Sequence, residues 1–168
     1  MTFDENTVSI TVTEPRSVPA TSVFFGGIAL VPMVVGAALG FVADGWAPLF
    51  VDLTLLWGAT IVIFLAGVRR GVSFRTMNGP TTSQLLVMLW LFGLGSGSLL
   101  VTALSVGTGA VPPAAIASAL LAVGFASLVI LDPIAADRGE APLFFKRLRP
   151  VQMPVAALAY GALTIAAL

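Results

Sequence analysis

The sequence predicts an all-α membrane protein with five transmembrane helices packed in one bundle. Of its 168 residues, 58% are hydrophobic and only 10% are charged, and the mean hydropathy is +1.03. Soluble domains carry roughly 25% charged residues, so a water-facing surface cannot be built from so few charges. In addition, apolar stretches long enough to cross the ~30 Å hydrocarbon core of a bilayer recur five times along the chain.

The five predicted spans follow one another with short polar breaks. At a rise of ~1.5 Å per residue, about 20 residues cross the hydrocarbon. The spans lie near residues 22–43, 47–68, 83–106, 111–131 and 150–168. Residues 1–18 are polar and lack the basic start of a secretory signal peptide, so we expect a retained N-terminal tail. Residues 19–168 then form a single transmembrane domain.

The basic residues predict which way the chain faces. All eight lysines and arginines lie in the tail, in the second break or in the fourth break. With five spans, these three segments share one side of the membrane, and the other side receives no basic residue. Because lysine and arginine favour the cytoplasmic side, we expect a cytoplasmic N-terminus and an outside C-terminus. The compartment expected is the bacterial inner (cytoplasmic) membrane.

The composition also excludes several kinds of chemistry. Cysteine and histidine are both absent from the sequence, which removes thiolate catalysis, disulfides and His-ligated haem or metal sites. Paired carboxylates at catalytic spacing and Gly-rich phosphate loops are missing, and the basic residues form no nucleic-acid face. We therefore predict no catalytic residue, no cofactor, no metal, no nucleic-acid partner and no enzymatic activity.

Three charged residues are predicted to meet at the cytoplasmic side of the bundle. Arg69 and Arg70 end the second predicted span, and Asp132 ends the fourth. Their matched depth and opposite charge predict an ion pair where water is scarce, which would fix the register of the two helices. This prediction assigns the residues a structural role.

Asp52 is the one carboxylate inside a predicted span, about one turn past its start. Two interpretations stay open at this point. It is either a hydrated residue at the outer interface or a proton or cation site that faces the bundle interior.

Small residues four positions apart predict close helix packing, because helices in lipid associate through backbone approach and polar contacts. Such pairs occur in or beside the first three spans. They are Gly36 and Gly40, Gly67 and Gly71, and Gly93 and Gly97. Packing inside the bundle and docking of a partner subunit are both compatible with them.

The stretch PLFFKRLRP at 142–150 predicts an interfacial lipid anchor before the last span. Aromatic rings can enter the interface while basic groups stay at the lipid headgroups. The residues assigned to this anchor are Phe144, Phe145, Lys146, Arg147 and Arg149.

The segment LWGATIVIFLAGVRRGVSF at 56–74 resembles the signature of the transmembrane-protein-69-like family, which comprises small five-span inner-membrane proteins with a domain of unknown function. The matching residues are Trp57, Gly58, Ala59, Phe64, Leu65, Gly67, Arg69 and Gly71. A second match begins at Asp132 and continues with LFFKRLRPVQ at 143–152. Ala66 and Arg70 depart from the pattern, in place of a glycine and a tryptophan. The resemblance implies topology and compartment and brings no activity.

Two functions from different classes fit these observations. The first is a non-catalytic accessory or assembly subunit that packs beside a larger bioenergetic membrane complex. Its partners would be membrane lipids and another membrane protein or a second copy of the chain. The alternative is a small oligomeric transporter or channel that uses Asp52 and the Gly-rich third span. A lipid-modifying enzyme is disfavoured because the usual catalytic side chains are missing.

A reporter fused after Leu168 tests the predicted orientation. We expect an alkaline phosphatase fusion, which folds only outside the cytoplasm, to be active, because five spans that start inside must end outside. A reporter that is active only in the cytoplasm at the same position would overturn the orientation or the number of spans.

Overall fold

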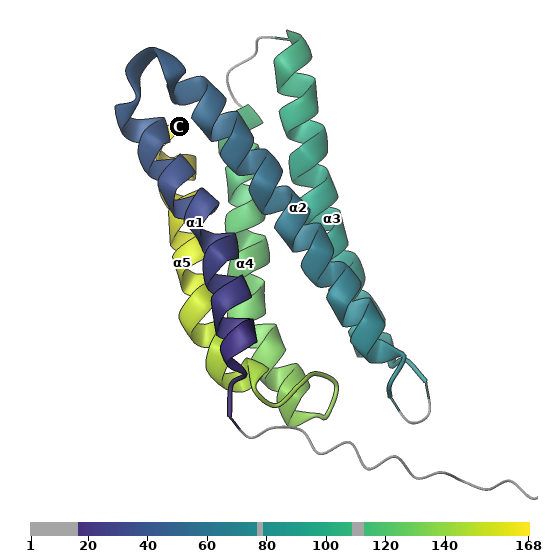
Figure 1. The fold of residues 1–168 in the computed structure, drawn as a ribbon. Helices are drawn as coiled ribbons and strands as arrows, with labels where there is room; N and C mark the ends of the chain where they lie inside the picture. Colours follow the sequence, from purple (N-terminus) through teal and green to yellow (C-terminus); the bar gives the residue numbers. More distant parts are fainter. Residues whose placement is uncertain (1–16, 77–78, 109–112) are drawn as a thin grey trace, which may run out of the picture.

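The protein folds as an all-α bundle of five helices (Figure 1), in a computed structural model that describes residues 17–76, 79–108 and 113–168. A short 3-10 turn, η1 (Asp44–Trp46), joins the first two helices. The five helices are α1 (Ala20–Val42), α2 (Ala47–Ser73), α3 (Thr82–Thr108), α4 (Pro113–Asp137) and α5 (Phe145–Ala166). Of the predicted polar tail, residues 1–16 lie outside the described part of the chain.

The helices form a ring with additional contacts across it. Each helix packs against its neighbours in sequence, α5 returns to pack against α1, and α2 also packs against α4. The starts of α1, α3 and α5 and the ends of α2 and α4 gather at one end of the bundle (Figure 1). We name this the inner end, after the predicted orientation, and the opposite one the outer end.

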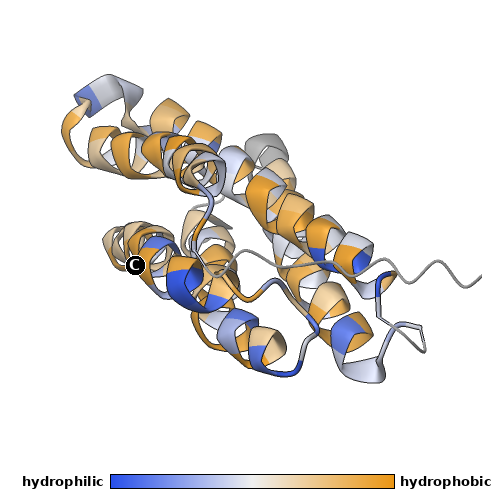
Figure 2. Ribbon diagram, turned by 60° about the horizontal axis from the view of Figure 1, so that its bottom comes forward, coloured by the Kyte–Doolittle hydropathy of each residue, from blue (hydrophilic) through white to orange (hydrophobic). Residues whose placement is uncertain are grey.

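Four of the five helices are long and apolar enough to cross a membrane, and the protein is therefore a multi-pass membrane protein. These segments are Ala20–Val42, Asp44–Ser73, Thr82–Leu104 and Ala114–Asp137. Most of their residues are hydrophobic (Figure 2), and many large apolar side chains on them are exposed, as expected where lipid is the solvent. α5 has 22 residues, including two internal prolines and Gln152. Its crossing of the membrane stays a prediction.

Helices extend beyond the predicted spans at the inner end. α2 continues to Ser73, past the predicted end at 68, and α4 continues to Asp137, past the predicted end at 131. α5 begins at Phe145, five residues before the predicted start at 150. The apolar pattern marks where the chain leaves the hydrocarbon, whereas a helix can continue into the interface with its backbone hydrogen bonds intact. Charged residues expected at helix ends therefore lie within helices.

The end of α4 shows which sequence signal sets a helix boundary here. The helix passes through Pro133, although proline cannot donate a backbone hydrogen bond. It ends at a Schellman turn, in which Gly139 adopts φ +70°. The N–H of Glu140 donates to the carbonyl of Ala135 at 2.8 Å, and that of Gly139 donates to Ala136 at 3.1 Å. Gly139, and not the proline, marks the boundary.

Tyr160 of α5 connects three helices in the bundle core. Its side chain is fully buried, and its ring stacks on Phe125 of α4 with 5.6 Å between the ring centroids. Its hydroxyl donates to the backbone carbonyl of Thr54 in α2 at 2.7 Å. This reach depends on Gly58, because a Cβ there would overlap the hydroxyl.

α1 approaches α2 at the glycine pair predicted in the first span. A Cβ at Gly36 would overlap the side chain of Thr54, and one at Gly40 would lie 2.9 Å from Cγ2 of Val51. Internal packing is therefore the role of this pair. The close approach lies in the outer half of both helices.

Three of the four glycines in the other two predicted pairs do not serve packing inside the bundle. A Cβ at Gly67, Gly71 or Gly93 would meet nothing within 4 Å, and one at Gly97 would make only an ordinary contact with Leu120 at 3.5 Å. The internal-packing interpretation is wrong for the first three, because they lie on outward faces of α2 and α3. The four-residue spacing in the sequence identifies a pair of glycines on one side of a helix, but it does not show whether that side faces the bundle or the lipid.

Two glycines of α2 provide a matched test of the core. We expect Gly58→Ala to lower the stability of the folded bundle by about 1–3 kcal/mol, because the new methyl group displaces Tyr160. Gly67→Ala adds the same methyl group on an open surface and should be neutral or stabilising by up to about 1 kcal/mol. Thermal unfolding in detergent micelles measures both. Equal effects of the two substitutions would contradict the described packing.

Candidate functional site

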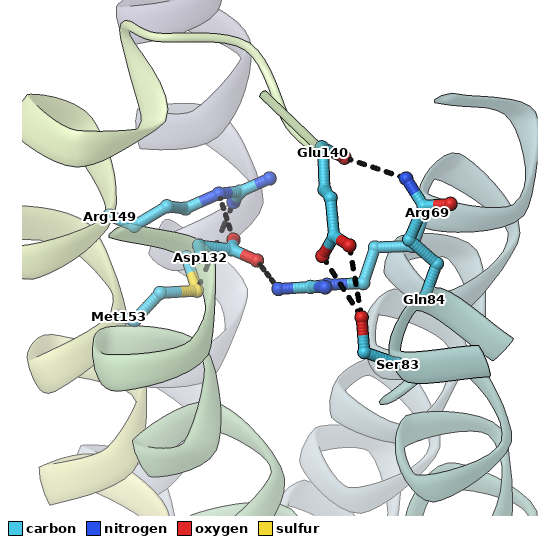
Figure 3. A network of polar contacts seen from close by, with 7 residues as sticks. All are labelled: Arg69, Ser83, Gln84, Asp132, Glu140, Arg149 and Met153. Carbon is cyan, nitrogen blue, oxygen red and sulfur yellow. Dashed lines mark hydrogen bonds and ion pairs between the residues drawn. The ribbon is translucent and has the colours of Figure 1, made fainter. Parts of the chain in front are cut away.

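Asp132 of α4 lies at the centre of a buried ion triad near the inner end (Figure 3). Its side chain is 1% exposed. One carboxylate oxygen pairs with Arg69 of α2, and the other lies 2.9 Å from Nε of Arg149 in α5. Three helices therefore meet at one carboxylate. We use the name ion triad for Arg69, Asp132 and Arg149.

The ion triad is held by charge more than by a complete set of hydrogen bonds. The Nε atoms of Arg69 and Arg149 are buried without a hydrogen-bond partner among the described residues. The guanidinium of Arg149 lies over the ring of Phe145, 4.4 Å from its centroid. Its Nη1 donates to the sulfur of Met153 at 3.9 Å. Attraction between charges is strong in such a site because water does not screen it.

The structure distinguishes between the two arginines predicted to pair with Asp132. Arg69 makes the ion pair between α2 and α4. Arg70 turns away: its guanidinium lies 4.3 Å from the ring centroid of Phe74, and its Nη1 donates to Oγ of Ser73 at 3.5 Å. The two adjacent arginines therefore lie in different environments.

The predicted lipid anchor divides into an exposed and a buried part. Lys146 and Arg147 are exposed, and Lys146 pairs with the exposed Asp137 at 2.7 Å. Phe145 and Arg149 are buried, so their assignment to the interface is wrong. The reason is that α5 already begins at Phe145, which turns these two residues, four apart, onto its inward face.

Phe144 lies between the two parts. It is half-buried and packs edge-on against Phe145, with 5.0 Å between the ring centroids.

A second polar cluster joins the two inner loops and was not predicted. The carboxylate of Glu140 accepts hydrogen bonds from the hydroxyls of Thr81 at 2.9 Å and Ser83 at 3.0 Å. Thr81 and Gln84 also form a reciprocal capping box at the start of α3, with N–H···O distances of 3.2 and 2.9 Å. The spacing Thr-x-x-Gln is the sequence signal that could have located this helix start. The partnership with Glu140 has no such signal.

Polar side chains inside the spans form contacts between helices. The indole N–H of Trp57 donates to the carbonyl of Ala29 in α1 at 2.9 Å. That of Trp90 in α3 donates to Oγ of Ser127 in α4 at 3.0 Å. In lipid, such groups need protein partners because water is absent. These contacts fix helix positions and supply no reactive group.

A cavity of about 210 Å³ lies beside the ion triad. It is situated where α1 and α2 diverge toward the inner end (Figure 1). α1 contributes Ala29 and Met33, α2 contributes Phe64, and α4 contributes Phe125. The side of the cavity formed by α5 is polar as well as apolar. Arg149, Gln152 and Met153 lie there.

Asp52 lies apart from the triad, toward the outer end. It is half-buried at a separate cavity of about 300 Å³, whose other lining residues are apolar or glycine. Among the described residues it has no hydrogen bond or ion pair, and the seven described basic residues all lie at the inner end. Both interpretations of Asp52 thus stay predictions.

The polar side chains described above form ion pairs and hydrogen bonds within the bundle, and the apolar side chains pack between its helices. No group of three or more acidic side chains in the described ranges could hold a metal ion. No family model, curated protein or solved structure matches the chain. The resemblance to the transmembrane-protein-69-like family rests on the residues quoted above and stays a prediction.

The adjacent arginines allow a matched test of the ion triad. We expect Arg69→Gln to destabilise the bundle by about 3 kcal/mol or more, because it leaves a buried carboxylate with one partner fewer. Arg70→Gln removes the same charge one residue away and should cost at most about 1 kcal/mol, from the lost contact with Phe74. Thermal unfolding in detergent reports both values. Similar losses for the two variants would contradict a special role for Arg69.

Proposed function

We propose that this integral membrane protein is a non-catalytic accessory or assembly subunit. In this proposal it crosses the bacterial inner membrane five times with its N-terminus in the cytoplasm and packs beside a larger, bioenergetic membrane complex. The observation that carries the proposal is the outward-facing glycine surface of α2. Most polar side chains inside the bundle bind to its own helices, while a Cβ added at Gly67 or Gly71 on this surface meets nothing within 4 Å among the described residues.

The distribution of charge supports the orientation. Seven basic and three acidic residues of the described chain lie at the inner end, and two acidic residues, Asp44 and Asp52, lie at the outer end. This asymmetry matches the positive-inside rule.

The dimensions and contacts of α5 support a fifth crossing. Its 22 residues extend about 33 Å at ~1.5 Å per residue, which is sufficient for the hydrocarbon core. It packs along α4, and the hydroxyl of Thr164 donates to Oγ of Ser118 at 3.0 Å. Together with the bond from Tyr160 to Thr54, this contact satisfies polar groups that lipid could not.

The exposed face of α2 carries the kind of residues that favour the approach of another helix. Gly67 and Gly71 expose backbone on it, and the large side chains of Phe64 and Phe74 flank them, both mostly exposed. A strip of exposed backbone between two aromatic rings allows a partner helix to approach closely, which is the main source of association energy in lipid. A second membrane protein or another copy of the chain fits this surface.

A small oligomeric transporter or channel is the second candidate, favoured by one observation. Asp52 faces a cavity at the outer end without a basic partner among the described residues. Between it and the ion triad lies the packed core around Tyr160 and Phe125. A transport path would therefore run between copies of the chain. Ion flux in proteoliposomes that disappears in Asp52→Asn would select this alternative.

Co-purification from native membranes in mild detergent tests the accessory role. We expect a membrane protein to co-purify with the chain at endogenous expression, and Gly67→Leu to reduce its recovery several-fold by covering the exposed backbone. Gly27→Leu in α1 is the matched control, because it also adds a side chain into open space. A solitary monomer, or equal losses for both variants, would count against the proposal.

A further inference from the structure

We propose that the cavity between α1 and α2 is a binding site for one anionic phospholipid. The phosphate group lies at Arg149 and Gln152, and an acyl chain enters the apolar part of the cavity. This inference stands apart from the accessory role, since it concerns a different face of the chain and needs no partner protein.

Two buried polar side chains face the cavity without full satisfaction. Arg149 and Gln152 are 8% and 7% exposed, and both line it. Oε1 of Gln152 has no hydrogen-bond partner among the described residues. Nε of Arg149 is ion-paired with Asp132 at 2.9 Å but makes no well-aligned hydrogen bond there. Buried polar atoms are nearly always paired, and leaving one unpaired costs about 1–3 kcal/mol. A phospholipid head group at this position would supply both kinds of partner: a phosphate oxygen accepts from the Arg149 guanidinium, and a head-group hydroxyl donates to Oε1 of Gln152.

The charge balance indicates that this head group is anionic. The ion triad carries two positive charges and one negative charge in a site shielded from water. The next carboxylate, Glu140, is turned toward Ser83 on the α3 side of the triad and does not line the cavity (Figure 3). Arg149 is the one charged residue among the cavity's described lining. An anion there would offset the excess buried positive charge.

The remaining walls have the chemistry of an acyl-chain site. They are formed mainly by aromatic and aliphatic side chains from four helices, and Phe25 and Phe64 at the rim are themselves largely exposed to lipid. An apolar cavity of about 150 Å³ is large enough for benzene. The present one, about 210 Å³, therefore holds a stretch of acyl chain whose remainder continues into the bilayer. A free phosphate ion would gain no binding free energy from these apolar walls.

The surrounding surface favours the same ligand. Seven basic residues against three acidic ones at the inner end give that end of the described chain a net charge of +4. Basic residues near an anionic leaflet attract its lipids, so anionic head groups are concentrated where the cavity opens.

Native mass spectrometry of the purified full-length chain tests the site. The probes are phosphatidylglycerol and phosphatidylcholine with identical acyl chains, added at equal concentration. We expect one retained phosphatidylglycerol per chain and about fivefold lower occupancy by phosphatidylcholine, because only the former leaves a net negative charge at Arg149. Equal occupancy by the two lipids would overturn the proposal.

Two substitutions of alanine by phenylalanine test where phosphatidylglycerol binds. Ala29→Phe fills the cavity from α1 and leaves the ion triad intact, so we expect occupancy by phosphatidylglycerol to fall at least fivefold. Ala126→Phe places the same ring in an apolar groove between α4 and α5 and should leave the occupancy unchanged. Unchanged occupancy by phosphatidylglycerol in Ala29→Phe, or an equal loss of occupancy in Ala126→Phe, would contradict binding in this cavity.

Labelling of the wild-type chain gives an answer that does not depend on any variant's folding. A phosphatidylglycerol with a photoactivatable acyl chain should cross-link mainly to residues 22–33 and 144–153, which contribute to the cavity wall. Even labelling of all five helices would overturn the proposal. Inorganic phosphate in excess should not displace the lipid, and displacement would show that an anion alone occupies the site.

Discussion

The carboxylate of Asp132 is the point on which the inner half of the bundle depends. Lipid provides no hydrophobic driving force for helices to associate, because acyl chains are as apolar as leucine side chains. At this end α1 and α2 diverge (Figure 1), although Gly26 of α1 still lets the side chain of Gln152 in α5 approach its backbone closely. One carboxylate with partners on both sides keeps α2, α4 and α5 at fixed distances from one another. The cavity beside it exists because α1 is not part of this arrangement.

The outer half of the bundle uses a different means of association. Gly36, Gly40 and Gly58 let side chains of neighbouring helices reach the backbone surface. Tyr160 fills the space that Gly58 leaves and bonds to a carbonyl of the same helix. The molecule thus combines steric packing at one end with charge pairing at the other. The transition between them lies along α2, which takes part in both.

The sequence was sufficient for the fold class and for part of the site. Composition and span length predicted an all-α membrane bundle, and matched depth predicted the pairing of the second and fourth helices. The third member, Arg149, was missed because a basic run before a span is normally exposed, and only the early start of α5 turns this residue inward. Periodicity likewise found the glycine pairs without revealing that Gly67 and Gly71 face outward. Helix rotation is set by all neighbours together, so one helix's sequence does not determine it.

The ion pair between Arg69 and Asp132 joins residues 63 positions apart, and this separation has a consequence for biosynthesis. Arg69 leaves the ribosome long before its partner, and until then its charge must stay in contact with water or lipid headgroups. In the proposed orientation, it can hold the end of α2 on the cytoplasmic side during that interval. Only when α4 has been inserted can the arginine give up that solvation for the buried carboxylate. The same side chain would first determine topology and later, in the finished bundle, hold helices together.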